Sequence, residues 1–386
     1  MIKKSCHPIF VSLIFASCIM SCRSSIQQYG DVIEIDLTKT YPEQEYVLQD
    51  IAEVNYLPLE TRDDFLVAGT LSYMDTEQII VKSNVRDQLF FFNRNTGAAL
   101  RILNRQGRGG NEYNRIDAFS CDSRAKEIFV LDVSKKTVLV YGFDQTYKRS
   151  FEVPANCVAM LGYDDSSLLV YIEQDTIPKP FLIISKESGN VLQTLNVTVG
   201  ARLNMMRVQI GDFVTEARMR GGSVSLVTAN DGVLLSDWAC DTLFFLDYSG
   251  MLEPVAIRKP SAYEMKPCSR LHIKGDNGRF VFFLSTLLPD AMNSAVIKTE
   301  YRRYVYDRQE HKIVTPRFVL ADDPTGAIWR GEHWGNQSGA YMMCELKAED
   351  LYAAYRDGKL QGRLKEIAAT LKEDDNPVLM TVKFNK

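Results

Sequence analysis

The sequence has few of the residues on which catalytic centres are usually built. Beyond the first 21 residues it contains three histidines, His272, His311 and His333, and neither an H-x-H nor an H-E-x-x-H pattern. A histidine-based metal centre is therefore not expected. The G-x-S-x-G turn that presents the catalytic serine of many hydrolases is also missing. Neither metal-assisted nor serine-based hydrolysis has a recognisable motif in this chain.

Cysteines are few, and their spacing indicates no shared site. Five follow the N-terminal segment at wide spacings and without a C-x-x-C, at Cys121, Cys157, Cys240, Cys268 and Cys344. An odd number at such spacings fits neither a disulfide framework nor a zinc site. We expect most of them to be small buried hydrophobic residues. The alternative is that two of them form a single disulfide bridge.

An excess of one charge is missing as well. The chain has 45 Lys and Arg against 49 Asp and Glu, a net charge of −4, and no long run of like charges. Nucleic-acid binding usually shows as a basic patch or stripe, so no nucleic-acid partner is expected. What the chain does have is a hydrophobic fraction of 46%, which is ordinary for a globular protein with a large core.

The N-terminus indicates export and lipid attachment. Lys3 and Lys4 precede a mostly apolar stretch over residues 9–20, which has the length of a signal-peptide core and is too short to span a bilayer. Ile19-Met20-Ser21-Cys22 resembles a bacterial lipobox. We therefore predict a signal peptide over residues 1–21 and lipidation of Cys22. Cys18 is the weaker alternative, and an ordinary signal peptide without lipidation stays open.

Residues 22–44 are predicted to be a flexible tether, since the stretch directly after Cys22 is polar. It has no acidic cluster, the feature that marks export to the outer face in some Gram-negative lineages. The sequence therefore favours a lipoprotein that contacts the outer membrane through its lipid anchor and faces the periplasm.

Short strand patterns recur along the rest of the chain. Each repeat has two apolar strands, a turn and a more exposed strand, and the second apolar strands begin at residues 89, 138, 181, 243 and 304. The spacings of 49, 43, 62 and 61 residues are too uneven for a solenoid. Loops above and below the blades of a β-propeller tolerate such scatter, so the repeats predict a propeller.

The clearest repeat is residues 101–141. Ile128–Leu131 and Val138–Tyr141 are predicted to be its two innermost strands. Before them, Gly107, Gly109 and Gly110 form a turn in which we expect positive φ angles, which glycine adopts most readily. This turn is interpreted as the connection from one blade to the next rather than as a phosphate-binding loop.

Strands are left over at both ends of the chain. Residues 340–346 and 378–384 have strand patterns, with a helical pattern over residues 348–371 between them. Together with five internal repeats, they predict an all-β, six-bladed propeller over residues 45–386, closed by N- and C-terminal strands and carrying a short C-terminal helical insertion. Seven blades is the alternative count.

Several segments resemble a family of Gram-negative lipoproteins known as six-bladed β-propellers, TolB-like or NHL-like in fold. Residues 107–113, Gly-Arg-Gly-Gly-Asn-Glu-Tyr, are similar to the family turn G-x-G-P-G-E-Y, with Gly110 and Asn111 at the places of the usual Pro and Gly. Residues 322–327 and 375–379 are also similar to family stretches. The resemblance covers nearly all of the chain after the signal peptide. It implies the propeller fold and the lipoprotein address, and no established activity.

Two segments are candidate ligand-binding sites. The richest is a stretch with two tryptophans beside charged side chains, Trp329, Arg330, Glu332, His333 and Trp334. Trp and Arg are enriched where binding energy concentrates, so a sugar or peptide pocket is one reading and packing under the sixth blade is the other. The second candidate is the glycine-rich turn, with Arg108, Glu112 and Tyr113 either at the mouth of the channel or fastening two blades.

Some six-bladed propellers are hydrolases that hold Ca²⁺ at the central axis with carboxylates. The candidate ligands here are Glu112, Asp117, Asp164 and Asp237, but their spacing does not define a cage. We therefore assign no metal site and no cofactor, and Ca²⁺ is the one ion kept open. The leading hypothesis is a non-enzymatic module that binds an envelope protein or a carbohydrate or peptide ligand. A metal-dependent propeller hydrolase, lactonase or lyase is the alternative, and a structural scaffold is a third hypothesis.

The lipid anchor is directly testable. Replacing Cys22 by Ser removes the thiol that would carry the lipid, so we expect the protein to move from the membrane fraction to the soluble fraction after cell fractionation. Cys18→Ser is the matched control and should stay with the membranes. Membrane retention of Cys22→Ser would contradict lipid attachment at this residue.

Overall fold

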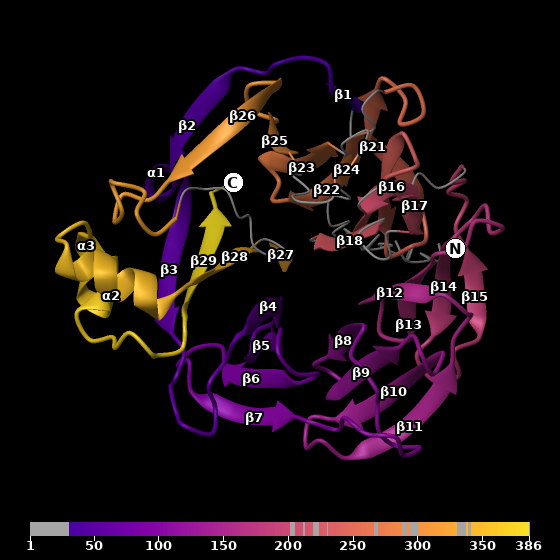
Figure 1. The fold of residues 1–386 in the computed structure, drawn as a ribbon, viewed down its shortest axis with the longest axis horizontal. Coiled ribbons are helices and arrows are strands. Elements are labelled where there is room, and N and C mark those ends of the chain that lie inside the picture. Colours follow the sequence, from indigo (N-terminus) through magenta and orange to yellow (C-terminus); the bar gives the residue numbers. More distant parts are fainter. Residues whose placement is uncertain are drawn as a thin grey trace, which may run out of the picture.

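The computed structural model describes residues 31–200, 205–210, 213–218, 224–229, 231–265, 269–287, 292–293, 300–329, 337–338 and 341–385. The predicted signal peptide and Cys22 lie outside these residues. Within them, six small sheets stand around a central axis, so the chain is a six-bladed β-propeller, as predicted (Figure 1). None of the described helices is long and apolar enough to cross a membrane.

Blades 1 to 3 are each built from four consecutive strands, ordered from the axis outward. Blade 1 contains β4 (Gly69–Met74), β5 (Gln78–Ser83), β6 (Leu89–Asn93) and β7 (Ala99–Leu103). Blade 2 contains β8 (Ala118–Asp122), β9 (Glu127–Asp132), β10 (Thr137–Gly142) and β11 (Tyr147–Glu152). Blade 3 contains β12 (Cys157–Gly162), β13 (Ser167–Ile172), β14 (Phe181–Ser185) and β15 (Val191–Thr194).

Blades 4 to 6 combine distant parts of the chain. Blade 4 contains β18 (Val224–Ala229), β19 (Gly232–Asp237), β20 (Thr242–Asp247) and β21 (Leu252–Lys259), with β1 (Ile33–Asp36) outside them. Blade 5 contains β22 (Ser269–Asp276), β23 (Phe280–Leu287), β25 (Glu300–Asp307) and β26 (Lys312–Val319), with β2 (Glu43–Val47) outside them. Blade 6 contains β27 (Gln337–Ser338), β28 (Tyr341–Leu346), β29 (Val378–Phe384) and β3 (Ala52–Pro58).

The remaining elements lie between or outside the blades. A three-stranded sheet is formed by β16 (Met205–Ile210), β17 (Phe213–Arg218) and β24 (Met292–Asn293). The helices are α1 (Leu48–Ile51), α2 (Ala348–Arg356) and α3 (Gly362–Ala368). Helices α2 and α3 connect β28 to β29 and pack with Leu351, Leu364 and Ile367 into the core of blade 6, so the helical insertion lies where the sequence predicted it.

The apolar core is divided among the interfaces between blades. In blade 1, Ile79 and Val81 belong to a cluster shared with blade 6, whereas Ile80 between them belongs to a cluster shared with blade 2. Successive side chains of a strand point to opposite faces, so one strand supplies the packing on both sides of its blade. The middle strands are therefore almost continuously buried, as in β9, β13 and β19.

The prediction that residues 128–131 and 138–141 are the innermost strands was wrong. They form β9 and β10, the middle of blade 2, and the innermost strand is β8. Strand β8 is largely half-buried because its inner edge faces the channel, while β9 and β10 have a strand on each side and a blade on each face. The most apolar strands of a blade are therefore its middle strands.

The N-terminal strands form a strap along the outer edges of three blades (Figure 1). Strand β1 pairs in parallel with β21, β2 pairs in parallel with β26, and β3 pairs with β29. The second half of the predicted tether, residues 22–44, is therefore part of the propeller. Ile33, Ile35 and Leu37 alternate with polar residues and are buried, which is the pattern of a strand on an apolar surface.

The ring closes in blade 6, as predicted. Seven residues of β29 pair antiparallel with β3, from Val378 opposite Pro58 to Phe384 opposite Ala52. A second contact crosses from blade 6 to blade 1, where the backbone N–H of Leu71 donates to the carboxylate of Glu345. Closure removes the open sheet edges that a linear array of blades would leave.

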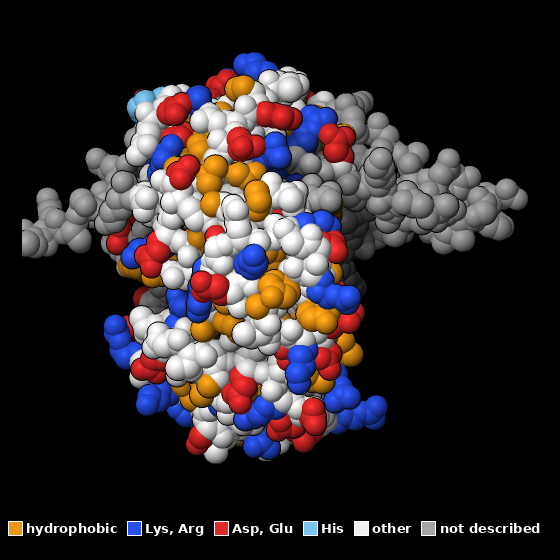
Figure 2. Space-filling model, turned by 90° about the vertical axis from the view of Figure 1, so that its left-hand side faces the viewer, with side chains coloured by type: hydrophobic (Ala, Val, Ile, Leu, Met, Phe, Trp, Pro, Cys, Tyr) orange, Lys and Arg blue, Asp and Glu red, His pale blue; other side chains and the backbone are white. Residues whose placement is uncertain are grey.

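The side of the ring that carries α2 and α3 is charged and mixed. Figure 2 shows acidic and basic side chains interspersed on this face, with hydrophobic side chains in small groups between them. A scaffold that docks through a large apolar patch would need a different surface from this one.

We predict that removing residues 378–386 destabilises the whole propeller, because it takes away β29 and exposes the edges of β28 and β3. Thermal and urea unfolding should show a lower midpoint, or loss of a cooperative transition. An unchanged midpoint would contradict closure through these strands.

A milder change in the same strand gives a folded comparison. Met380 is fully buried, so Met380→Ala should lower the free energy of unfolding by about 2–5 kcal/mol. The matched control is Lys383→Ala at an exposed position of β29, where we expect a change within about 0.5 kcal/mol.

Candidate functional site

The candidate site is the central channel, which encloses a cavity of about 1590 Å³. Its wall comes from the innermost described strands, β4, β8, β12, β18 and β22, and from Tyr341 of β28. Turns at one face of the ring add polar residues, among them Arg94, Asp164 and Ser166. A concave site of this kind is the usual place for a ligand in a rigid scaffold.

Three of the wall residues are presented by β-bulges. In β4, β12 and β22 the pairing with the next strand skips one residue, and these extra residues are Ser72, Val158 and Lys274. All three line the cavity. A bulge re-aims a side chain and is common beside functional sites. The bulged strands belong to blades 1, 3 and 5, so the special positions alternate around the channel.

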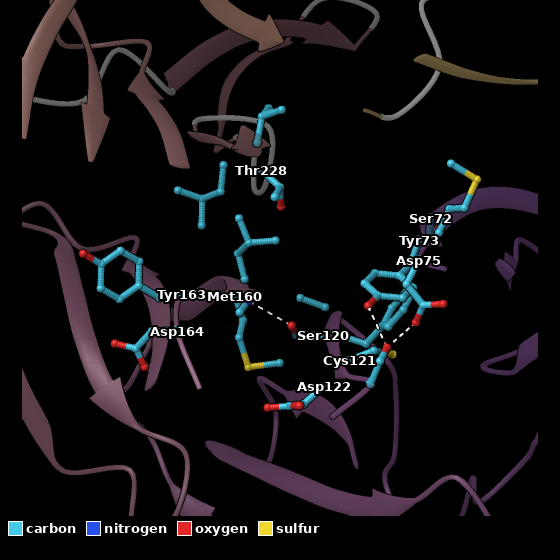
Figure 3. A pocket seen from close by; sticks show the side chains of 18 of the residues that line it. Ser72, Tyr73, Asp75, Ser120, Cys121, Asp122, Met160, Tyr163, Asp164 and Thr228 are labelled. Carbon is cyan, nitrogen blue, oxygen red and sulfur yellow. Dashed lines mark hydrogen bonds between the residues drawn. The ribbon is translucent and has the colours of Figure 1, made fainter. Parts of the chain in front are cut away.

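One side of the wall is a small hydrogen-bonded cluster (Figure 3). The hydroxyl of Ser123 donates to the carboxylate of Asp75, and the hydroxyl of Tyr73 lies 3.3 Å from Ser123 Oγ. The other oxygen of Asp75 accepts the backbone N–H groups of Glu77 and Gln78, each at 2.7 Å. The described lining contains no histidine that could act as a base for Ser123. The cluster is suited to hydrogen bonding with a polar ligand group rather than to nucleophilic attack.

The opposite side of the wall is apolar. Val158, Met160 and Leu161 of β12 and Leu226 and Val227 of β18 line the cavity. Met160 is only 6% exposed, because its side chain also belongs to the core cluster between blades 2 and 3. The channel therefore offers an apolar surface on one side and hydrogen-bonding groups on the other, which suits an amphipathic ligand.

Charges in the lining are balanced and mostly paired. Lys186 Nζ lies 2.5 Å from Asp122 Oδ2, and Arg124 pairs with Asp165. The guanidinium of Arg94 lies 5.6 Å from the centre of the Tyr341 ring. With Asp75, Asp164 and Lys274, these side chains make four acidic and four basic groups. The channel therefore has no single-sign field that would select a polyanion or a polycation.

Cys121 also lines the channel but is not suited to act as a nucleophile. Burial raises the pKa of its thiol well above the usual value, which keeps it protonated. The same cause raises the pKa of Cys157 to about 12 and of Cys240 to about 11. None of these three cysteines is in a disulfide, and Cys268 lies outside the described residues.

Trp329, the first residue of the predicted tryptophan-rich site, lines a second cavity of about 610 Å³ near the outer strands of blade 5. Tyr41, Tyr304 and Arg317 line the same cavity. The Trp329 side chain is only 5% exposed and belongs to the core cluster shared by blades 5 and 6. The other four residues of that prediction, Arg330, Glu332, His333 and Trp334, lie outside the described residues.

The glycine-rich turn lies away from the channel lining and fastens blade 1 to blade 2. Tyr113 is fully buried, and its hydroxyl donates to the carbonyl of Asp87 at 2.9 Å. Its ring meets Tyr141 of blade 2 edge-on, with centroids 6.1 Å apart. Lys135 Nζ donates to the carbonyl of Gly109 at 2.9 Å, while Arg108 is exposed.

The expected reason for the glycines was wrong. Gly107, Gly109 and Gly110 are not among the residues with positive φ. At position 107 the absence of a side chain leaves room for Glu112, because a Cβ there would lie 2.0 Å from Glu112 Oε2 and the carboxylate would have to move. That same oxygen accepts the backbone N–H of Gly109 at 2.8 Å. The turn is therefore closed by a half-buried Glu112 carboxylate that packs over Gly107 and accepts the N–H of Gly109.

The four carboxylates proposed for Ca²⁺ do not converge. Glu112 binds the turn around Gly109, and Asp117 accepts the N–H of Val133 at 2.8 Å. Asp164 accepts the N–H of Ser166 at 2.7 Å, and Asp237 accepts that of Ala239 at 2.8 Å. In the described part of the chain, no three His, Cys, Asp or Glu side chains lie close enough together to hold a metal ion.

Of the residues that line the channel, sequence reasoning named Asp164, as a candidate for Ca²⁺, and missed the others. Ser72, Tyr73, Asp75 and Lys274 stand in segments with ordinary strand patterns, and a bulge leaves no mark in a pattern of alternating residues. The one available signal was the order of the strands in each repeat. The short, half-polar strand that precedes the two apolar strands is the innermost strand of the blade.

Comparison with known proteins gives a family and a fold. The family described as "Domain of unknown function (DUF4934)" matches residues 32–383. A solved structure named "Putative exported protein" from Bacteroides fragilis is similar at a TM-score of 0.64 and 15% identity, over 92% of this chain and all of that one. A member of the DUF4221 family from Bacteroides vulgatus has a TM-score of 0.48 and 10% identity, over 87% of this chain and 97% of that one. No curated protein matches the sequence significantly.

The glycine turn yields a prediction on stability. Gly107→Ala places a methyl group against Glu112 and should displace the carboxylate from Gly109 N–H, which costs about 1 kcal/mol of unfolding free energy. Adding Glu112→Ala removes the clash, so the double variant should lose less than the sum of the two single variants in urea unfolding.

The control is Gly110→Ala, since no atom lies within 4 Å of a Cβ at that position. Its unfolding free energy should change by no more than about 0.5 kcal/mol. Additive losses in the double variant would show that Glu112 is not the reason for glycine at position 107.

Proposed function

The chain belongs to the DUF4934 family, and we propose that it is a lipid-anchored binding protein of the cell envelope whose ligand enters the central channel. One observation carries the proposal: a cavity of about 1590 Å³ with an apolar wall on one side and hydrogen-bonding groups on the other. Cavities of several hundred Å³ or more accommodate organic ligands, and a few placed polar groups set their orientation.

The shape of the fold supports binding at this place. Each blade is fixed on both sides by a buried cluster, so the inner strands form a rigid wall. A preformed wall lowers the entropy that binding would otherwise cost. The balanced charges favour a neutral ligand or one with a single charged group, for example a small carbohydrate, a peptide segment or a lipid-like acid.

The proposed localisation in the cell envelope rests on the N-terminal sequence. The basic start, the short apolar stretch and Cys22 are the features of a lipoprotein signal peptide. The name of the similar Bacteroides fragilis protein, which includes the word exported, is consistent with this address. We propose attachment to the outer membrane on its periplasmic side, with residues 22–32 as the link between the lipid and β1.

Binding is favoured over metal-dependent hydrolysis because the acidic side chains accept backbone N–H groups and do not converge on one point. The carboxylates that were candidates for Ca²⁺ each accept a backbone N–H, three of them within their own turn and Asp117 from Val133, and they come from separate places in the fold. A hydrolytic metal needs three or more such groups around one point. The channel lining instead resembles a recognition surface.

If the ligand binds in the central channel, larger side chains on the channel wall should weaken ligand binding. Val158 and Thr228 lie on the inner strands β12 and β18 and line the cavity. The double variant Val158→Trp/Thr228→Trp should weaken binding of the neutral fluorescent probe N-phenyl-1-naphthylamine about tenfold or more, measured by fluorescence titration.

The matched control is Val191→Trp/Leu192→Trp on the outer strand β15, where the side chains are 49% and 58% exposed. It adds the same two rings outside the channel and should leave the affinity unchanged, and thermal unfolding should show that both variants are folded. Equal affinity of the wild type and the channel variant would contradict the channel as the binding site.

A further inference from the structure

Lys274 has an unusual place in the channel wall. It is the extra residue of the bulge in β22, since Ile273 pairs with Phe283 and Gly275 pairs with Phe282. The bulge leaves Lys274 outside the ladder of β23, and its side chain lines the cavity. The neighbouring strand β18 is close, because the hydroxyl of Ser225 donates to the carbonyl of Ile273 at 2.9 Å.

The charged side chains of the lining differ in their contacts. Asp122, Asp165, Lys186 and Arg124 form ion pairs, Arg94 stacks on Tyr341, and Asp75 and Asp164 accept hydrogen bonds. Lys274 is the one charged side chain of this lining that makes no hydrogen bond, ion pair or ring contact in the described chain.

The surroundings of Lys274 disfavour its charge. Burial lowers the pKa of its amine, and no neighbouring carboxylate raises it again. An ammonium group that has lost part of its water without gaining a partner costs free energy. An anionic ligand group beside Lys274 would offset that cost, whereas a neutral ligand group would not.

The rest of the wall suggests the body of such a ligand. Strand β18 packs against β22 on one side and β12 on the other. Leu226 and Val227 of β18 and Val158 and Leu161 of β12 therefore continue the wall from Lys274 as an apolar surface. A single basic group at the edge of an apolar surface is complementary to an organic acid with an apolar body.

We propose that Lys274 binds the anionic group of an organic acid whose apolar body lies against β18 and β12. The proposal rests on the proposed function, since it names the ligand class for the same channel. Lys274 then sets specificity within the channel, and the Asp75–Ser123–Tyr73 cluster on the other side is left for a second, polar part of the ligand.

The test uses two probes that differ by one anionic group. N-phenyl-1-naphthylamine is neutral, and 8-anilinonaphthalene-1-sulfonate has the same rings with a sulfonate. The wild type should bind the sulfonate more tightly than the neutral probe. Lys274→Met should weaken sulfonate binding about tenfold and leave the neutral probe within about twofold, because only the charge-assisted contact is lost.

Two further variants separate the contact from general effects. Lys274→Arg keeps the positive charge and should keep the preference for the sulfonate. Lys312→Met removes a positive charge from β26, outside the channel lining, where Lys312 pairs with Glu310, and should change neither affinity. A second pair of ligands extends the test to carboxylates: decanoate should displace the neutral probe better than decan-1-ol from the wild type, and no better from Lys274→Met.

The outcomes distinguish the two proposals. If the neutral probe binds in the channel but the sulfonate has no advantage, or keeps it in Lys274→Met, the role of Lys274 is overturned and the channel remains a binding site. If neither probe binds the wild type, the channel proposal is overturned and the role of Lys274 with it. Should Lys274→Met fail to fold, Lys274→Gln is measured in its place, with the same expected result.

Discussion

The constraint on which the whole structure depends is that every blade has two apolar faces and must be covered on both. The described core consists of six clusters, and each one lies between two neighbouring blades. A blade at the end of an open row would leave one of these faces in water. The pairing of β3 with β29 completes blade 6, whose two faces cover blade 5 on one side and blade 1 on the other, so no blade is left at an open end.

This constraint explains which parts of the fold could be predicted from the sequence. Because the middle strands are buried on both faces, segments such as Ile128–Leu131 are continuously apolar and stand out as repeats. Blade number and closure follow from counting them. The inner strands are short and half-polar because one edge faces the channel, so the repeats located the blades correctly and placed the innermost strands wrongly. The alternation at Ile33, Ile35 and Leu37 was available as a strand signal, but its partner β21 is more than 200 residues away in the chain.

The candidate site was much less visible, for a physical reason. The channel is assembled from short segments of several blades, so its composition is never present in one stretch of sequence. The contact that places Glu112 against Gly107 depends on side-chain geometry, and the presentation of Lys274 depends on a bulge that shifts the register by one residue. Tryptophan-rich composition pointed instead to Trp329, whose ring contributes to the core between blades 5 and 6.

The strap of N-terminal strands has a mechanical consequence. A protein tied to a surface through its N-terminus receives tension at residues 31–33 before anywhere else. The load reaches the β1–β21 pairing in blade 4 first, then β2–β26 in blade 5, and only then β3, the strand that closes the ring. Two outer pairings must yield in sequence before the closure is strained. Under the proposed lipid attachment, tension from the membrane would therefore be taken up by the outer strand pairings before it reached the channel wall.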